Sequence, residues 1–105
     1  MLRIYPVVLE TIEALRTVTA QIERRDRDLG RQLRRAASSV ALNVAEGMYS
    51  RGQLRQARYH TALGSAGETL ACLGVARAWG YVAALDPALV AKLQRIIGTF
   101  VHLAA

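Results

Sequence analysis

The sequence contains a single cysteine, two prolines, one lysine and no apolar run long enough to span a bilayer. Because Cys72 has no second cysteine to pair with, no intramolecular disulfide forms, which fits a reducing cytosol. The longest uncharged runs, Ala36 to Ala45 and Ile96 to Ala105, are about half as long as a membrane-spanning helix. The first apolar stretch soon meets Glu10 and Glu13, unlike a secretory signal. These absences predict a cytoplasmic protein with no membrane partner.

Residues that build common catalytic and metal sites are also scarce. The two histidines and one cysteine lie far apart and lack the spacing of metal ligands. There is no glycine-rich phosphate loop. Arg55 followed by His60 resembles the Arg-x4-His signature of the metal-independent HEPN ribonucleases, but their side chains differ by about 140° around a helix. We expect no enzymatic activity, metal or cofactor, with a ribonuclease as a minor alternative.

Arginine and apolar side chains, by contrast, are abundant. Fourteen basic residues oppose eight acidic ones, giving a formal charge of +6, and every basic residue except Lys92 is arginine. A net positive charge favours polyanionic partners such as nucleic acid. Apolar residues make up 52% of the chain, which is more than one small bundle needs. With 105 residues we expect a single domain that associates with further copies of itself.

Apolar residues recur at helical spacing in four stretches separated by short turn signals. The stretches predict helices over about residues 6–25, from 29 to a turn at 47–50, from 51 to 79, and from 87 onward. Their expected inward residues are Val8, Ile12, Leu15, Thr19 and Ile22, then Leu29, Leu33, Ala37, Val40, Val44 and Met48, then Leu63, Ala66, Leu70 and Leu73, and finally Leu89, Leu93, Ile96, Ile97 and Phe100. Short loops between amphipathic helices predict an all-α, up-down-up-down antiparallel four-helix bundle. A three-helix arrangement with the last helix docked elsewhere is the alternative.

Local signals mark the helix boundaries. Asp28 is the expected N-cap of the second helix, and Ser50 with Gln53 has the spacing of a capping box for the third. Gly80 is expected to end the third helix in the left-handed conformation. Asp86, which is followed by a proline, is expected to cap the last helix.

Three glycines, Gly64, Gly67 and Gly74, interrupt the third helix, and each is expected to destabilise it by about 1 kcal/mol relative to alanine. On a helical projection they share one arc with Ala71 and Ala78, beside the inward arc. This glycine strip would let another backbone approach closely. It faces either a helix of the same bundle or another subunit, and the sequence leaves both open.

The order of residues in the second and third helices is similar to that of a known family. The specific segments are Gln32-Leu33-Arg34-Arg35-Ala36-Ala37, Asn43 with Ala45-Glu46-Gly47, Ala62 with Gly64-Ser65, Glu68, and Gly80-Tyr81. They resemble the bacterial four-helix bundle proteins encoded in intervening sequences of large-subunit ribosomal RNA genes, a group that includes the accessory protein of diversity-generating retroelements. Two positions depart from the family pattern, with Ala41 in place of a proline and Leu70 in place of an acidic residue.

The resemblance implies a cytosolic, non-enzymatic bundle that assembles as a homopentamer, a barrel with a basic central pore. It also implies an association with nucleic acid, because the retroelement accessory protein binds nucleic acid and a reverse transcriptase. A protein partner of this kind is therefore a further expectation.

Two groups of arginines are the candidate nucleic-acid-binding residues. The turn cluster lies on one face at the start of the third helix and consists of Arg51, Arg55 and Arg58. No acidic residue lies between Gly47 and Gly67 to neutralise it. The Arg24–Arg35 cluster is diluted by three acidic residues and consists of Arg24, Arg25, Arg27, Arg31, Arg34 and Arg35.

Guanidinium groups bind phosphate through paired hydrogen bonds, and tyrosine rings stack on unpaired bases. Because Tyr49 and Tyr59 lie near the turn cluster, RNA or DNA is the expected ligand, with little sequence preference. The alternative is an interaction module without a nucleic-acid role, whose arginines only keep an apolar oligomer in solution.

Some polar residues are expected to support the structure rather than bind a ligand. In an antiparallel hairpin that turns near Ser50, position 35 lies level with position 65, so Glu68 lies level with the end of the Arg24–Arg35 cluster. We expect Arg34 or Arg35 to pair with Glu68 and to set the register of the helices. This pairing makes both arginines weaker candidates for nucleic-acid contact.

Asn43 and Glu46 lie near the end of the second helix, level with Ala57 and Leu54 of the third. As neighbouring polar groups they are a candidate site. We expect them instead to bond the turn and the backbone of Ser50.

Overall fold

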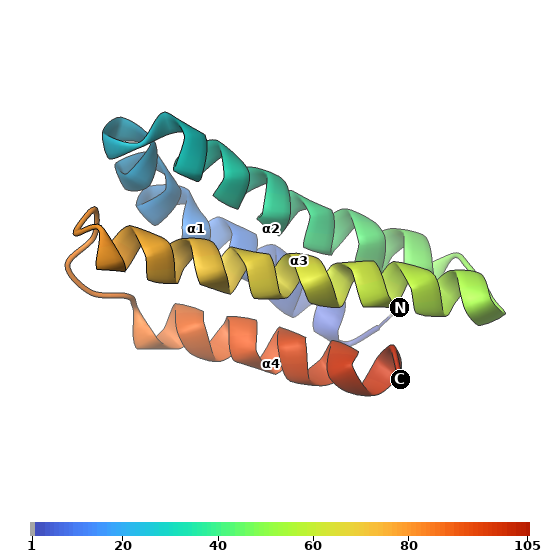
Figure 1. Cartoon of the computed structure of the whole chain (residues 1–105). Helices are drawn as coiled ribbons and strands as arrows, with labels where there is room; N and C mark the ends of the chain where they lie inside the picture. Colours follow the sequence, from blue (N-terminus) through green and yellow to red (C-terminus); the bar gives the residue numbers. More distant parts are fainter. Residues whose placement is uncertain (1) are drawn as a thin grey trace.

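A computed structural model describes residues 2–105. They form four helices, α1 (Ile4–Arg25), α2 (Arg27–Met48), α3 (Gly52–Ala78) and α4 (Pro87–Leu103). The helices run alternately up and down, and each packs against the next while α4 closes against α1 (Figure 1). The protein is therefore an all-α, up-down-up-down antiparallel four-helix bundle, as predicted, and the three-helix alternative is wrong. No helix within residues 2–105 combines the length and apolarity needed to cross a bilayer.

The core consists of two layers of buried side chains along the bundle axis. One layer, toward the α1–α2 turn, includes Leu33 and Leu73, and the other, toward the α2–α3 turn, includes Val44 and Phe100. Each of these side chains is fully buried, which contributes roughly 1.5–3 kcal/mol apiece. The predicted inward residues of α1, α2 and α4 are buried except for three half-buried ones, Ile12, Met48 and Ile97.

The inward face of α3 differs from the prediction. Leu63 and Leu70 are only half-buried, whereas Ala62, Thr69 and Cys72 are buried. The leucine arc is rotated relative to the true contact face because α3 meets α2 through small side chains. Apolar periodicity cannot identify such a face, since alanine and threonine give a weak hydrophobic signal.

Two of the predicted helix caps are wrong. Asp26, not Asp28, caps α2, and its Oδ1 accepts the Leu29 N–H at 2.9 Å. Because α1 ends at the preceding residue, α2 begins earlier than predicted, and Asp28 lies in its first turn. The Ser50 hydroxyl donates to the Glu46 carbonyl at 2.8 Å instead of capping α3.

The start of α3 is displaced by a left-handed glycine. Gly52 has a φ of 57°, which glycine adopts without the strain that other residues would suffer. Arg51 therefore becomes the N-cap, with no side-chain hydrogen bond to the helix. The remaining two boundaries are as predicted: Gly80 is left-handed at φ 79°, and Asp86 accepts the Ala88 N–H at 2.9 Å.

The glycines of α3 lie on the outside of the bundle. A Cβ placed at Gly64, Gly67 or Gly74 meets no atom within 4 Å, so the glycine strip does not pack against a helix of the same bundle. Close approach between helices depends on Gly30 and Gly47 instead. A Cβ at Gly47 would overlap the Tyr59 ring, and one at Gly30 would lie 3.0 Å from Glu23 Cα.

Candidate nucleic-acid interface

α2 turns into α3 at one end of the bundle (Figure 1), and the turn cluster lies there, from the N-cap of α3 into its first turns. Arg51, Arg55 and Arg58 are all exposed. Helical spacing places the last two on one face of the first turns of α3, and Arg51 precedes them at the N-cap. The Arg51 side chain makes no hydrogen bond or ion pair with any residue from 2 to 105. Its five N–H donors are therefore available to a ligand.

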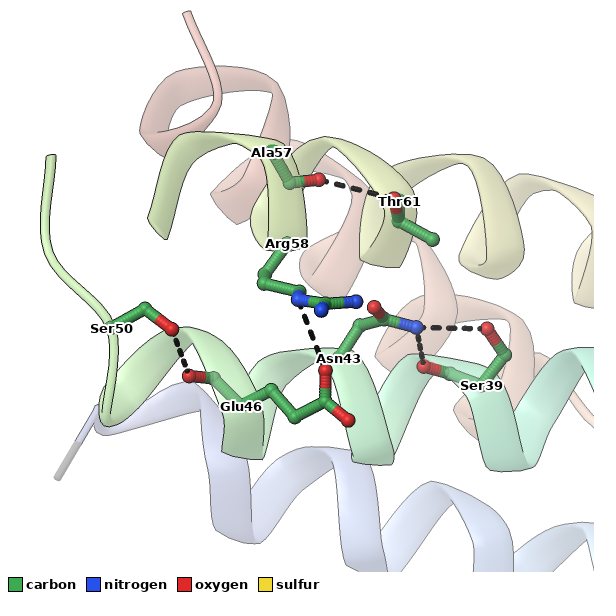
Figure 2. Close-up of polar contacts among 7 residues, drawn as sticks. All are labelled: Ser39, Asn43, Glu46, Ser50, Ala57, Arg58 and Thr61. Carbon is green, nitrogen blue, oxygen red and sulfur yellow. Dashed lines mark hydrogen bonds and ion pairs between the residues drawn. The ribbon is translucent and has the colours of Figure 1, made fainter. Parts of the chain in front are cut away.

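Arg58 has an acidic partner that the sequence prediction missed. Its Nε lies 3.0 Å from Glu46 Oε2, and Figure 2 shows the side chain reaching from α3 across to α2. The prediction that the turn cluster lacks a neutralising acid is therefore wrong for Arg58. Both side chains are about half exposed, at 49% and 55%, so the pair contributes only about 0–1 kcal/mol.

Arg55 supports the turn as well as carrying charge. Its Nε donates to the Gly47 carbonyl at 3.1 Å. The same carbonyl accepts the Ser50 N–H at 3.1 Å, so the Arg55 bond is a second one that ties α3 to the end of α2. The remaining guanidinium donors of Arg55 are not used by that bond.

Asn43 and Glu46 support the structure, but not in the manner predicted. The Asn43 Nδ2 donates to the Ser39 carbonyl at 2.9 Å and to the Ser39 hydroxyl at 3.1 Å, within α2 itself (Figure 2). Only the backbone carbonyl of Glu46 bonds Ser50. Glu46 faces Arg58 rather than Leu54, so the hairpin register differs from the predicted one by about a helical turn at this end.

The predicted pair between Glu68 and Arg34 or Arg35 is wrong. The Gln32 Nε2 donates to Glu68 Oε2 at 3.3 Å, and Arg34 pairs with Glu23 of α1. Arg34 lies on the side of α2 that faces α1, which puts it out of reach of α3. Arg35 borders an open hollow of about 320 Å³ whose other lining residues are Asp28, Arg31, Gln32 and Glu68.

The Arg24–Arg35 cluster lies at the other end of the 42 Å bundle, around the α1–α2 turn. Arg24, Arg25, Arg27 and Arg31 are exposed, and the Arg25 guanidinium lies 5.7 Å from the centre of the Tyr81 ring. The Tyr81 hydroxyl donates to Asp26 Oδ2 in the α1–α2 turn at 3.2 Å. Acidic neighbours lower the net charge here, and the structure does not bring the two arginine clusters together.

The two candidate stacking tyrosines lie in opposite environments. Tyr49 is 90% exposed at the end of α2. Tyr59 is buried, with its ring 5.3 Å from that of Phe100, so the prediction that it stacks on a base is wrong. Burial raises the pKa of the Tyr59 phenol, and the nearby Arg55 charge opposes that shift.

Arg3 is a basic residue that the sequence analysis left out. It is exposed directly before α1. The neighbouring Leu2 N–H lies 3.4 Å from the Met48 sulfur, which places Arg3 at the same end as the turn cluster. The antiparallel topology predicts this position of Arg3, because the start of the first helix must lie beside the end of the second.

The histidines and the cysteine that the sequence offered lie in different surroundings, with His60 and His102 exposed and Cys72 buried. Arg55 turns toward Gly47, while His60 is exposed on the same helix. Cys72 is buried, and burial followed by the Glu68 charge raises the pKa of its thiol, which keeps it protonated. Among residues 2–105 no group of His, Cys, Asp and Glu side chains is placed to hold a metal ion.

Fold and site together define a small four-helix bundle protein with exposed arginines at both ends. The family model described as 23S rRNA-intervening sequence protein matches residues 2–98. The chain therefore belongs to the 23S rRNA-intervening sequence protein family, as the segments in α2 and α3 predicted. A search of curated proteins and a search of solved structures each found no match.

Proposed function

We propose that this protein is a non-enzymatic, cytoplasmic, homo-oligomeric scaffold that binds RNA or DNA through clustered arginines. The observation that carries the proposal is the exposure of the whole turn cluster, for which Glu46 is the one acidic partner among residues 2–105. Guanidinium groups in this arrangement suit phosphate oxygens. Contacts to phosphate carry no sequence information, so we expect binding to depend little on sequence.

Self-association is supported by the outer face of α3. The glycine strip is open on the subunit, and large apolar side chains lie exposed on or beside α3, including Val75 at 45%, Trp79 at 69% and Leu54 at 70%. A strip of small residues bordered by apolar ones suits close contact with a second copy. A homopentamer, the assembly that the family resemblance implies, would present the turn cluster five times. Several weak phosphate contacts then act together.

Binding through phosphate contacts has a characteristic salt dependence. Each neutralised phosphate releases counterions, so the affinity falls steeply as salt is raised from about 50 to 200 mM. We therefore test the proposal by gel shift and fluorescence anisotropy with RNA and DNA at both salt concentrations. The wild-type protein is expected to bind at low salt and to weaken at high salt.

A matched pair of variants separates local from overall charge. Arg51/Arg55/Arg58→Glu is expected to abolish binding while sedimentation shows unchanged assembly. The control Arg16/Arg77/Arg95→Glu changes the net charge by the same amount at exposed positions on α1, α3 and α4, and it is expected to retain most of the binding. Absence of wild-type binding at low salt, or binding indifferent to salt, refutes the proposal and favours the interaction module.

A further inference from the structure

The Tyr49 side chain packs little against the described residues 2–105. It is the C-cap of α2, and its backbone N–H donates to the Glu46 carbonyl at 3.2 Å, so the main chain is anchored. Its side chain is 90% exposed, the largest exposed fraction among the large apolar residues. Leaving an aromatic ring in water forgoes the favourable free energy of burial, and a tyrosine suits a binding surface because its ring is apolar and its hydroxyl polar.

A hollow of about 440 Å³ adjoins the ring. It is lined by Ala45, Glu46, Tyr49, Ser50 and Arg58. The hollow is shallow and open to solvent. It is bordered by the Tyr49 ring, the Ser50 hydroxyl and the Glu46–Arg58 ion pair.

The charges divide this region into two parts. At the hollow, the Glu46 carboxylate neutralises Arg58 and therefore disfavours a phosphate. The same carboxylate can accept a hydrogen bond from the amino group of a base. Arg51 follows Ser50 in the chain and is exposed and unpaired among the described residues, while Arg55 keeps free donors and lines a neighbouring hollow. The arrangement fits a flat base on Tyr49 and its phosphate at Arg51.

We infer that the turn cluster takes single-stranded nucleic acid, with an unpaired base stacked on Tyr49. This inference rests on the proposed function and names the substrate class of the same site. Paired bases in a duplex are stacked on each other and cannot reach the ring, whereas the bases of a single strand can turn outward. A protein ligand is less suited to the hollow, because covering it would take the Glu46–Arg58 ion pair out of water, which costs free energy.

The test compares a labelled single strand with a duplex of the same length by fluorescence anisotropy. The wild-type protein is expected to bind the single strand more tightly. Tyr49→Ala is expected to weaken single-strand binding by about 5- to 150-fold per stacked base and to leave duplex binding unchanged. Tyr49→Phe retains the ring and should bind as wild type. Leu42→Ala removes an exposed apolar side chain from α2 and should have no effect.

A spectroscopic measurement checks stacking directly. In a Trp79→Phe background, Tyr49→Trp fluorescence should be quenched by the single strand and not by the duplex. Equal wild-type affinity for both probes, or unchanged single-strand binding by Tyr49→Ala, overturns the inference while the proposed function stands. Altered sedimentation of Tyr49→Ala would place the ring at a protein contact and also overturn it. Failure of the wild type to bind either probe refutes the proposed function itself.

Discussion

The glycine strip provides the sharpest test of self-association, because replacing it by alanine has opposite effects on the subunit and on the assembly. In the subunit, the added methyl groups of Gly64/Gly67/Gly74→Ala meet no atom within 4 Å. Each substitution removes the helix penalty of glycine, about 1 kcal/mol, so the subunit gains about 3 kcal/mol. For a chain of this size, each kcal/mol raises Tm by roughly 4–8 °C.

In an assembly that buries the strip, the same methyl groups enter a close-packed contact. Overpacking of this kind destabilises by about 1–3 kcal/mol per site, and a symmetric oligomer repeats it at every interface. The variant is therefore expected to dissociate while its subunit becomes more resistant to unfolding. Sedimentation velocity measures the first effect, and urea unfolding at low protein concentration measures the second.

The control is Gly98→Ala on α4, where an added Cβ also meets nothing within 4 Å. It should stabilise the subunit by about 1 kcal/mol and leave the assembly intact. If the triple variant assembles like wild type, the glycine strip is not the subunit contact. If its subunit is less stable than wild type, the strip is packed within the bundle and the structural argument fails.

Three further predictions concern the subunit. Gly47→Ala should destabilise the subunit by about 1–2 kcal/mol in urea unfolding, because the new Cβ would lie 2.7 Å from Tyr59 Cδ1. This overpacking exceeds the gain in helix propensity, and a stabilised variant would contradict the prediction. Asp26→Ala should cost about 0.5–2 kcal/mol in thermal unfolding and Asp28→Ala distinctly less, since only Asp26 caps α2; equal losses would refute the assignment. Burial raises the pKa values of the Tyr59 phenol and the Cys72 thiol, so the unfolded chain loses these protons first. Their contribution to stability is present below the ordinary pKa values, about 8.5 for cysteine and 10 for tyrosine, and is lost as pH rises through the raised ones. Tyr59→Phe should therefore flatten the fall in urea midpoint above about pH 10, and an unchanged slope would count against it.

Features set by local sequence could be predicted, whereas features set by neighbouring elements could not. Gly80 and Asp86 were assigned correctly because each signal lies at a boundary with no competitor nearby. Asp26 and Asp28 lie two residues apart, and the choice between them depends on where α1 ends. Ser50 and Gln53 have the spacing of a capping box, but α3 begins at Gly52, whose left-handed conformation that spacing does not reveal.

The same distinction between local sequence and neighbouring elements applies to the candidate site. Exposure of the turn cluster followed from helical spacing alone. The partners of Arg58 and Glu68 come from another helix, and a register error of about one turn was enough to misassign them. Tyr49 and Tyr59 look equivalent in sequence, and only packing against Phe100 distinguishes the buried ring from the exposed one.

The separation of the two arginine clusters has a consequence for the length of the ligand. The bundle is 42 Å long, and a duplex rises 3.4 Å per base pair, so a duplex must contain about 12 base pairs to lie along the whole axis. Shorter fragments can touch one end only. A rise in affinity near that length would therefore indicate that one duplex contacts both arginine clusters at once.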